Sequence, residues 1–560
     1  MRDLPVMRLA ERPVLLLDAQ ATAASPARGA LVELGWASFP GLSAATDVEA
    51  LVVAPPPGAT MPRAVARITG IGTAEWERGV APEAAWRRLE AAASSLGSLP
   101  APVVVHYARF EEPHLRALHE RHGHGAFPLR LVCTHAIARR LLPELPRRTL
   151  RALAGYFGAG VPELRRAADH VIATAFVWRH LAEALEAEGV GDLDGLEDWL
   201  AARPATAATR GRRAFPLERD RRLALPRGPG VYRMHRAGGA VVYVGKATSL
   251  RQRVSSHFQA RGGERALEML SQVREVTCVE TATALEAAIL ETDEIKRLDP
   301  PYNRALLGVG RSVHYASLAL DTLSETADAW HPVGPLGSAA PFETLAALRS
   351  LLAGESPASL AQRAKALGLD PRWAPAADCF EEGRARFVAA HGRLASPRDV
   401  RKVGARLWRE RRAAAEALDA EDAPPRPAWT PDVVRAALEE SVLRAAHALR
   451  RARWLLRLSE STLAWSDTGG GGTRRALVVE RGAVAARADL APDEPMPLPP
   501  GARRPLAERR ASIDVATFDR LRVLTTELRA LVDEADGLEL RVGAHARLSP
   551  RRLRVVLEWV

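Results

Sequence analysis

The chain has little cysteine and no long hydrophobic run. Its three cysteines, Cys133, Cys278 and Cys379, are scattered, and no C-x-x-C pair offers a zinc site. A disulfide framework is therefore not expected, which is consistent with a reducing cytoplasm. The apolar stretch VLLLDA near the start is too short for a signal peptide. No run approaches the roughly 18 apolar residues of a membrane helix, so the sequence predicts a cytoplasmic protein without a membrane partner.

Lysine is scarce as well. Among 78 Lys plus Arg residues, lysine stands only at positions 246, 296, 365 and 402. The formal net charge of +11 favours an anionic partner, most often nucleic acid, although a genome bias toward Arg would give the same excess. Lysine is a compact charge whose pKa shifts readily, whereas arginine is a planar fork that is always charged. A lysine kept directly after Tyr243-Val244-Gly245 is therefore a candidate for chemistry.

The length of 560 residues predicts three or four domains. Strand-like and helical stretches alternate over residues 1–200, which predicts an α/β domain. A basic Pro/Ala/Arg linker over 201–227 leads to a compact α+β unit over 228–305. A loop and helical region over 306–425 follows, and then a C-terminal helical plus β region of unknown role over 426–560.

The C-terminal half carries few recognisable signals. A long basic helix, or a pair of helices, is expected over 431–463, and a hairpin that turns at Arg481-Gly482 follows the GGGG run at 469–472. The segment LRRARWLLRLSE at 449–460 places Trp454 among arginines. It either binds DNA by phosphate contacts and stacking or packs on a core with a solvated arginine face.

The unit at 228–305 has a clear pattern. Two strands are expected around a Gly238-Gly239 turn, followed by a helix, a third strand and a second helix whose start has capping-box spacing. In that second helix, Glu291 shares its face with apolar residues such as Ala287 and Ile295. A buried carboxylate must be paired or bind a metal. The alternative is an acid at the edge of the stripe that reaches water or pairs with an arginine.

Several motifs in this unit match one family. The tripeptides Gly230-Val231-Tyr232 and Tyr243-Val244-Gly245, the run GKATSLRQRVSSHF and the run EAAILETDEIKRLDPPYN occur at matching spacing over roughly 75 residues. The unit resembles the GIY-YIG nucleases, most closely the N-terminal nuclease module of UvrC-type excision repair endonucleases. The resemblance implies a small α+β fold with a three-stranded antiparallel sheet.

The resemblance also implies catalytic roles on the strands and the first helix. Tyr232 would activate the attacking water, and Tyr243 would bond around the scissile phosphate. Lys246 and Arg253 would contact and polarise that phosphate. Because a neighbouring cation lowers the pKa of a tyrosine, Lys246 is expected to tune Tyr232. The alternative is that Lys246 only contacts the DNA backbone.

Three further positions complete the expected site. Glu291 falls on the sole ligand of one Mg²⁺ or Mn²⁺ ion, which would stabilise the leaving oxygen. Asn303 falls on the asparagine that closes the site. His257 stands where UvrC-like proteins usually carry another tyrosine, so altered rather than lost function is expected there.

Residues 1–200 resemble the DnaQ-like (DEDDh) 3′–5′ exonucleases. The matching stretches are VLLLDAQATAASPARGALVELGWA, ARITGI, VVVHYARFEEPHL and TLRALAGYFG. The resemblance implies a ribonuclease-H-like α/β domain that binds two metal ions. The metal positions depart from the family, because Asp18 remains while Gln20 and Glu111 replace a glutamate and an aspartate.

The third exonuclease motif departs further. It aligns best with Arg165 and His170, with Asp169 one residue out of place. We therefore expect an inactive domain that serves docking or DNA handling. The alternative is an alignment error and an active site made of Asp18, Glu111 and Asp169.

These observations predict a multidomain α/β and α+β protein whose C-terminal region is mainly helical with a small β element. The predicted function is that of a Mg²⁺-dependent, structure- or damage-specific DNA endonuclease that nicks one strand, as in UvrC/Cho-like nucleotide excision repair. DNA is the expected partner, a UvrB-like protein is a candidate partner, and the nucleoid is the expected place. The alternatives are a dual nuclease that trims 3′ ends after nicking and a non-catalytic DNA-binding scaffold.

Overall fold

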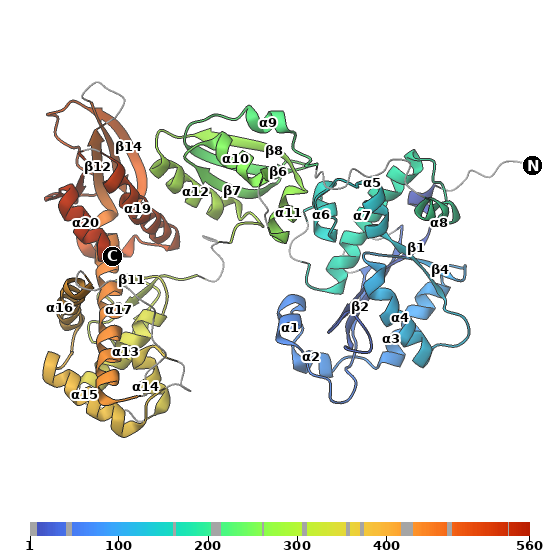
Figure 1. Cartoon of the computed structure of the whole chain (residues 1–560), viewed down its shortest axis with the longest axis horizontal. Helices are drawn as coiled ribbons and strands as arrows, with labels where there is room; N and C mark the ends of the chain where they lie inside the picture. Colours follow the sequence, from blue (N-terminus) through green and yellow to red (C-terminus); the bar gives the residue numbers. More distant parts are fainter. Residues whose placement is uncertain are drawn as a thin grey trace, which may run out of the picture.

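The computed structural model of the chain describes most of its residues (Figure 1). The described ranges are 8–40, 47–160, 164–202, 214–259, 263–304, 311–353, 359–369, 374–415, 429–466, 473–535 and 537–560. The GGGG run at 469–472 and parts of the predicted linker lie outside them. None of the helices in these ranges combines the length and the apolar character needed to cross a membrane.

The N-terminal part is an α/β unit with one mixed sheet. Its strand order is β3-β2-β1-β4-β5, with β2 and β3 antiparallel and β4 and β5 parallel to the chain direction of β1. The strands are β1 (Val14–Ala21), β2 (Leu31–Phe39), β3 (Glu49–Val52), β4 (Ala101–Val105) and β5 (Leu129–Cys133), preceded by the 3₁₀ turn η1 (Leu9–Glu11).

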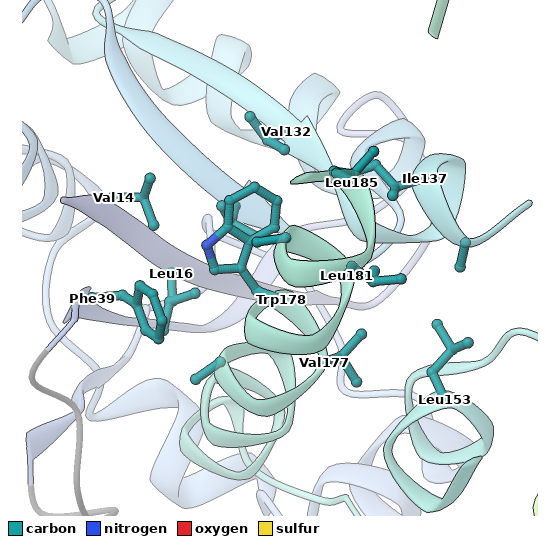
Figure 2. Close-up of a cluster of buried hydrophobic side chains, with 14 of the residues drawn as sticks. Val14, Leu16, Phe39, Val132, Ile137, Leu153, Val177, Trp178, Leu181 and Leu185 are labelled. Carbon is teal, nitrogen blue, oxygen red and sulfur yellow. The ribbon is translucent and has the colours of Figure 1, made fainter. Parts of the chain in front are cut away.

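Helices cover both faces of this sheet. On one face α7 inserts the buried Trp178 against Val14, Leu16 and Phe39 (Figure 2), while α3 and α4 bury Trp86 and Leu115 on the other. The helices are α1 (Arg63–Thr69), α2 (Thr73–Glu77), α3 (Pro82–Ser94), α4 (Ala108–His122), α5 (Thr134–Leu141), α6 (Leu150–Tyr156), α7 (Ala167–Ala187) and α8 (Leu193–Ala201). The predicted α/β class of this part is confirmed.

The central module, residues 228–304, is built on a three-stranded antiparallel sheet of order β7-β6-β8, as predicted. Gly238 and Gly239 both have φ of 83° at the turn between β6 and β7, a conformation that favours glycine. Its elements, with the short α9 (Arg219–Leu223) before them, are β6 (Gly230–Arg236), β7 (Val241–Ala247), α10 (Leu250–Gln259), α11 (Glu264–Leu270), β8 (Val273–Glu280) and α12 (Ala284–Leu298).

The loop and helical region after the central module holds a small sheet that the sequence analysis did not predict. Its order is β10-β9-β11, and four helices follow before the long helix α17. The elements are β9 (His314–Ala316), β10 (Leu323–Ser324), β11 (Val333–Leu336), α13 (Ala340–Ala353), α14 (Leu360–Leu367), α15 (Ala377–His391), α16 (Pro397–Ala415) and α17 (Pro431–Leu458).

The expected helix over 431–463 is wrong at its end. One helix, α17, stops at Leu458, and the residues from Glu460 form a buried strand. Ser461, Thr462 and Leu463 lie in the centre of a sheet, where β-branched and apolar residues pack well. Pairing with the neighbouring strands therefore makes this segment a strand, although the pattern before it is helical.

The C-terminal β element is a five-stranded antiparallel sheet of order β14-β13-β12-β15-β16. The predicted hairpin turn is confirmed, since Arg481 and Gly482 have φ of 48° and 76° between paired strands. The elements are β12 (Glu460–Ser466), β13 (Arg474–Glu480), β14 (Ala483–Leu490), α18 (Leu506–Ala511), α19 (Val515–Glu534), β15 (Glu539–Val542), β16 (Ala546–Leu548) and α20 (Pro550–Glu558).

Helix α19 packs beside α12, which joins the C-terminal sheet to the central module (Figure 1). Asp519 of α19 is 1% exposed and accepts from Lys296 at 2.7 Å and from Arg311 at 2.7 Å. Arg520 pairs with Asp293 beside them. A buried carboxylate between two cations is satisfied only in this arrangement, so the pairs fix how α19 lies on α12.

Candidate active site

The central module brings five of the predicted site residues to one cavity of about 630 Å³. Strands β6 and β7 carry the two tyrosines and the lysine, α10 carries the arginine, and α12 carries the glutamate. The residues of this group that line the cavity are Tyr232, Tyr243, Lys246, Arg253 and Glu291. Opposite charges and hydroxyl groups therefore face one space.

Glu291 is tied to strand β7. Its Oε1 accepts a hydrogen bond from the main-chain N–H of Lys246 at 3.0 Å. Burial raises the pKa of Glu291, the nearby Lys246 opposes this, and Glu527 adds to it. The carboxylate is thus half-buried at the cavity wall with one oxygen partly free of protein partners, which suits a cation ligand better than a surface acid.

Tyr232 is fully buried, and its hydroxyl oxygen lies 2.6 Å from Nε2 of His257. Burial raises the pKa of Tyr232, the neighbouring Tyr243 raises it further, and Arg253 opposes the shift. The pKa of Tyr232 is thus raised overall, whereas a lowered pKa was expected from the neighbouring Lys246. The ammonium of Lys246 pairs instead with Glu527, and desolvation of the phenol exceeds the effect of the cations.

His257 is the group that can receive the proton of Tyr232. Burial and the charge of Arg253 lower the pKa of His257 to about 4. The imidazole is therefore neutral at neutral pH, and in the tautomer that is protonated at Nδ1 its Nε2 offers a lone pair to the phenol. The substitution of the expected tyrosine by histidine thus puts a base next to the buried phenol, although His257 does not itself line the cavity.

Asn303 lies behind strand β7 rather than in the cavity. Its Nδ2 donates to the carbonyl of Val244 at 2.9 Å, and its Oδ1 accepts from the N–H of the same residue at 3.0 Å. The amino group and the carbonyl oxygen of the buried Asn303 side chain both bond to Val244, which stands between Tyr243 and Lys246. Asn303 is therefore a positioning residue for β7.

Sequence reasoning missed Glu527. This residue comes from α19 of the C-terminal part, lines the same cavity and pairs with the ammonium of Lys246. It lies 281 residues from Lys246 in the sequence. No local motif marks it, because only the packing of α19 on α12 brings its carboxylate to the cavity.

Five of the six predicted exonuclease positions line a second cavity of about 960 Å³ in the N-terminal part. Asp18 Oδ1 lies 3.1 Å from Nδ1 of His170, and although burial opposes it, the Asp18 charge raises the pKa of His170. Gln20 donates to the carbonyl of Arg165 at 2.8 Å. Burial, and then Asp18, raises the pKa of Glu111 well above its usual value. Asp18 is thus paired with His170, and burial favours the neutral form of the Glu111 carboxyl.

Asp169 is not part of that cavity. Its Oδ2 accepts from the N–H of Arg166 at 3.0 Å and caps the start of α7. The alternative set of Asp18, Glu111 and Asp169 is therefore not brought together. Among the residues that the structure describes, no group of three His, Cys, Asp or Glu side chains could hold a metal ion.

The comparison with known protein families decides the identity of the central module. The family model of the UvrC-like GIY-YIG domain matches residues 228–304. These residues form a UvrC-like GIY-YIG domain. The UvrABC system protein C of Zymomonas mobilis is 47% identical over 98 residues, which cover 17% of this chain and 15% of that protein.

Two other similarities extend the comparison. A protein of Mycobacterium tuberculosis named "Putative bifunctional exonuclease/endonuclease protein" is 34% identical over 205 residues, or 36% of this chain and 30% of the relative. The magnesium-bound GIY-YIG N-terminal endonuclease domain of UvrC from Thermotoga maritima is 31% identical, with 15% of this chain and 94% of that chain covered and a TM-score of 0.15. The chain spans less than a third of the length of the curated relatives from Mycobacterium tuberculosis and Zymomonas mobilis.

Replacement of Asn303 by alanine should loosen strand β7. The variant leaves the buried N–H and C=O of Val244 without their side-chain partner, which should cost about 1–3 kcal/mol of stability. Chemical denaturation and hydrogen exchange at Val244 measure the effect. Arg304→Ala, an exposed neighbour, is the control. Equal protection of Val244 in both variants would contradict the positioning role.

Proposed function

We propose that this chain is a DNA endonuclease that hydrolyses one phosphodiester at its GIY-YIG domain with the help of a divalent cation. The observation that carries the proposal is the convergence of Tyr232, Arg253 and Glu291 on one cavity within a segment that matches the UvrC-like family. Lys246 and Tyr243 line the same cavity. A scaffold that only binds DNA would not need a buried tyrosine beside a neutral imidazole.

The donor set of the cavity fits a magnesium-type ion. Mg²⁺ prefers oxygen ligands and is usually held by one or two carboxylates together with water and substrate phosphates. Glu291 would hold the ion, and Glu527 lies on the same cavity and could supply a second carboxylate oxygen. Bound there, the cation would polarise the phosphate and stabilise the leaving oxygen.

The side chains of the chain itself would handle the phosphate and the water. Arg253 and Lys246 would hold the non-bridging oxygens of the scissile phosphate by charge-assisted hydrogen bonds. The oxygen of Tyr232 would take a proton from the attacking water while its own hydroxyl proton passes to Nε2 of His257. A water O–P bond forms, the P–O bond to the leaving strand breaks, and one strand is nicked.

The damage-specific role follows the same resemblance. We infer incision of distorted or damaged DNA, as in UvrC/Cho-like nucleotide excision repair, with a UvrB-like protein as a candidate partner. The N-terminal domain would handle DNA without cutting it. The ion pair of Asp18 with His170, the raised pKa of Glu111 and the capping role of Asp169 support this over 3′ trimming.

The substitution Glu291→Gln should lower nicking of a lesion-bearing duplex in Mg²⁺ by about 10²–10³-fold, because it removes the charge that holds the cation. Gel analysis of a labelled duplex measures it. Glu280→Gln, an exposed acid on β8, is the control. Glu527→Gln should retain most of the maximal rate but need more Mg²⁺.

The same gel assay distinguishes the proposed endonuclease from the two alternative functions. Stepwise 3′ shortening that Asp18→Ala abolishes would support a dual nuclease. Binding without cleavage in any divalent metal would leave a scaffold and overturn the proposal.

The pH dependence of nicking should follow Glu291. Because its pKa is raised, its carboxyl keeps a proton to a higher pH than an exposed glutamate, and that proton competes with the cation. At limiting Mg²⁺ the rate should therefore rise with pH through this raised pKa, and saturating Mg²⁺ should move the midpoint to lower pH. Rate profiles at two Mg²⁺ concentrations test this, and a midpoint that does not move with Mg²⁺ would contradict it.

The substitution His257→Gln should lower nicking by about 10²-fold, because a general base is removed while a hydrogen-bonding group remains. Gln259→Ala, exposed on the same helix, is the control. If His257 acts through Tyr232, then His257→Gln should cost nothing further in a Tyr232→Phe background. Additive losses in the double variant would contradict the proposed proton path.

A further inference from the structure

The C-terminal half contains a groove walled by positive charge. Two adjoining cavities of about 450 and 500 Å³ lie between α16 and α17 and share four arginines, with α20 beside the first cavity and β11 and α18 beside the second. The basic side chains that line the two cavities, named the arginine groove below, are Arg398, Arg401, Lys402, Arg450, Arg453, Arg457 and Arg510. The groove lies outside the residues that match the GIY-YIG family.

Helix packing brings these cations together. Arg450, Arg453 and Arg457 follow the i, i+3, i+7 spacing of one face of α17, and Arg398, Arg401 and Lys402 share a face of α16. The two helices approach closely at Gly404, where an added Cβ would lie 2.2 Å from the Cβ of Ala446. A glycine at this contact therefore lets the two rows of cations lie side by side.

The groove has no acidic side chain in its lining, although the main-chain oxygen of Val560, which lines one cavity, accepts from Arg451 at 2.7 Å. No Asp or Glu side chain lines either cavity, and within the described ranges none of the seven basic side chains pairs with a carboxylate. Arginines nearby on the same helices do pair, as Arg411 does with Glu440 and Arg435 with Glu439. The Nε of Arg510 is buried without a hydrogen-bond partner. The groove thus gathers seven basic side chains that no acidic side chain of the described residues neutralises.

The cations of the groove also repel one another. Burial and the neighbouring Arg453 lower the pKa of Arg401, and the same causes lower that of Arg457. Like charges held this close repel and disfavour the compact state. An arrangement of cations that costs stability and lacks acidic partners is typical of a site for an external anion.

The aromatic content of the groove limits what it can recognise. Trp454 forms part of the wall, but it is 4% exposed and donates its indole N–H to Thr525 at 3.0 Å. The hypothesis that Trp454 stacks on a base is therefore wrong, and the core-packing alternative holds for this residue. With cations and no free aromatic in the lining, the groove suits phosphates rather than bases.

We propose that the arginine groove is a second DNA-binding site, which holds the sugar-phosphate backbone of the substrate without reading its sequence. The arginine row on α17 extends over about 10 Å, the length of about three phosphates along one strand. The identity of the anion as DNA rests on the proposed nuclease function, and the net charge of +11 agrees with it. The groove would anchor the duplex away from the position of the cut.

The test compares two triple variants of the full chain that lose the same charge. One is Arg398→Gln, Arg453→Gln and Arg457→Gln in the groove. The control is Arg87→Gln, Arg88→Gln and Arg116→Gln on α3 and α4, which are also exposed. Fluorescence anisotropy with a labelled duplex of about 30 base pairs in EDTA measures affinity from low to high salt, and thermal unfolding measures the fold. Because EDTA removes the metal, Glu291→Gln should not change this binding.

We expect the groove variant to bind at least about tenfold more weakly in low salt, with a log–log salt slope smaller by about 2.7. Its melting temperature should equal or exceed that of the parent, because the repulsion is relieved. The control should keep the parent slope. Equal slopes in the two variants would overturn the proposal. Loss of nicking in Glu291→Gln with parent-like binding tests the proposed function separately.

Discussion

The hydrogen bond from the main chain of Lys246 to the carboxylate of Glu291 is the contact on which the site depends. It joins strand β7 to helix α12, and thereby places a tyrosine, a lysine and an acid around one cavity. Asn303 holds the same strand from behind through Val244. A strand that shifted by one residue would turn these side chains to the opposite face, so register and chemistry are inseparable here.

Burial sets the chemistry of this cavity. It raises the pKa of both Tyr232 and Glu291 and lowers that of His257. A phenol that resists ionisation is a poor base alone, and in the proposed reaction the neutral imidazole 2.6 Å away would take its proton as the water loses its own. The glutamate, in turn, gains most from a cation, because a bound ion replaces the solvation that burial removed.

The cavity of the GIY-YIG domain and the N-terminal cavity differ in the surroundings of their acidic side chains. In the GIY-YIG domain, Glu291 keeps an oxygen toward the cavity and is flanked by cations that a phosphate would meet. In the N-terminal cleft, Asp18 is paired with His170, and the Glu111 carboxyl is driven toward its neutral form. The second cleft thus lacks the concentrated negative charge that two divalent ions require. Helix α19 also changes the charge at the central cavity, because its Glu527 pairs with the ammonium of Lys246.

Local sequence was sufficient for the central module. The Gly238-Gly239 turn, the capped α12 and the clustered motifs all act over short range, so the strands, the helices and the group around Glu291 could be predicted. The sequence also indicated the altered metal positions at Gln20 and Arg165. Only the tertiary structure decided the pairing of Lys246 with Glu527, the direction of the Tyr232 pKa, the strand that follows Leu458 and the arginine groove. Each of these depends on desolvation or on contacts between segments far apart in the chain, and neither leaves a periodic or local signal in the sequence.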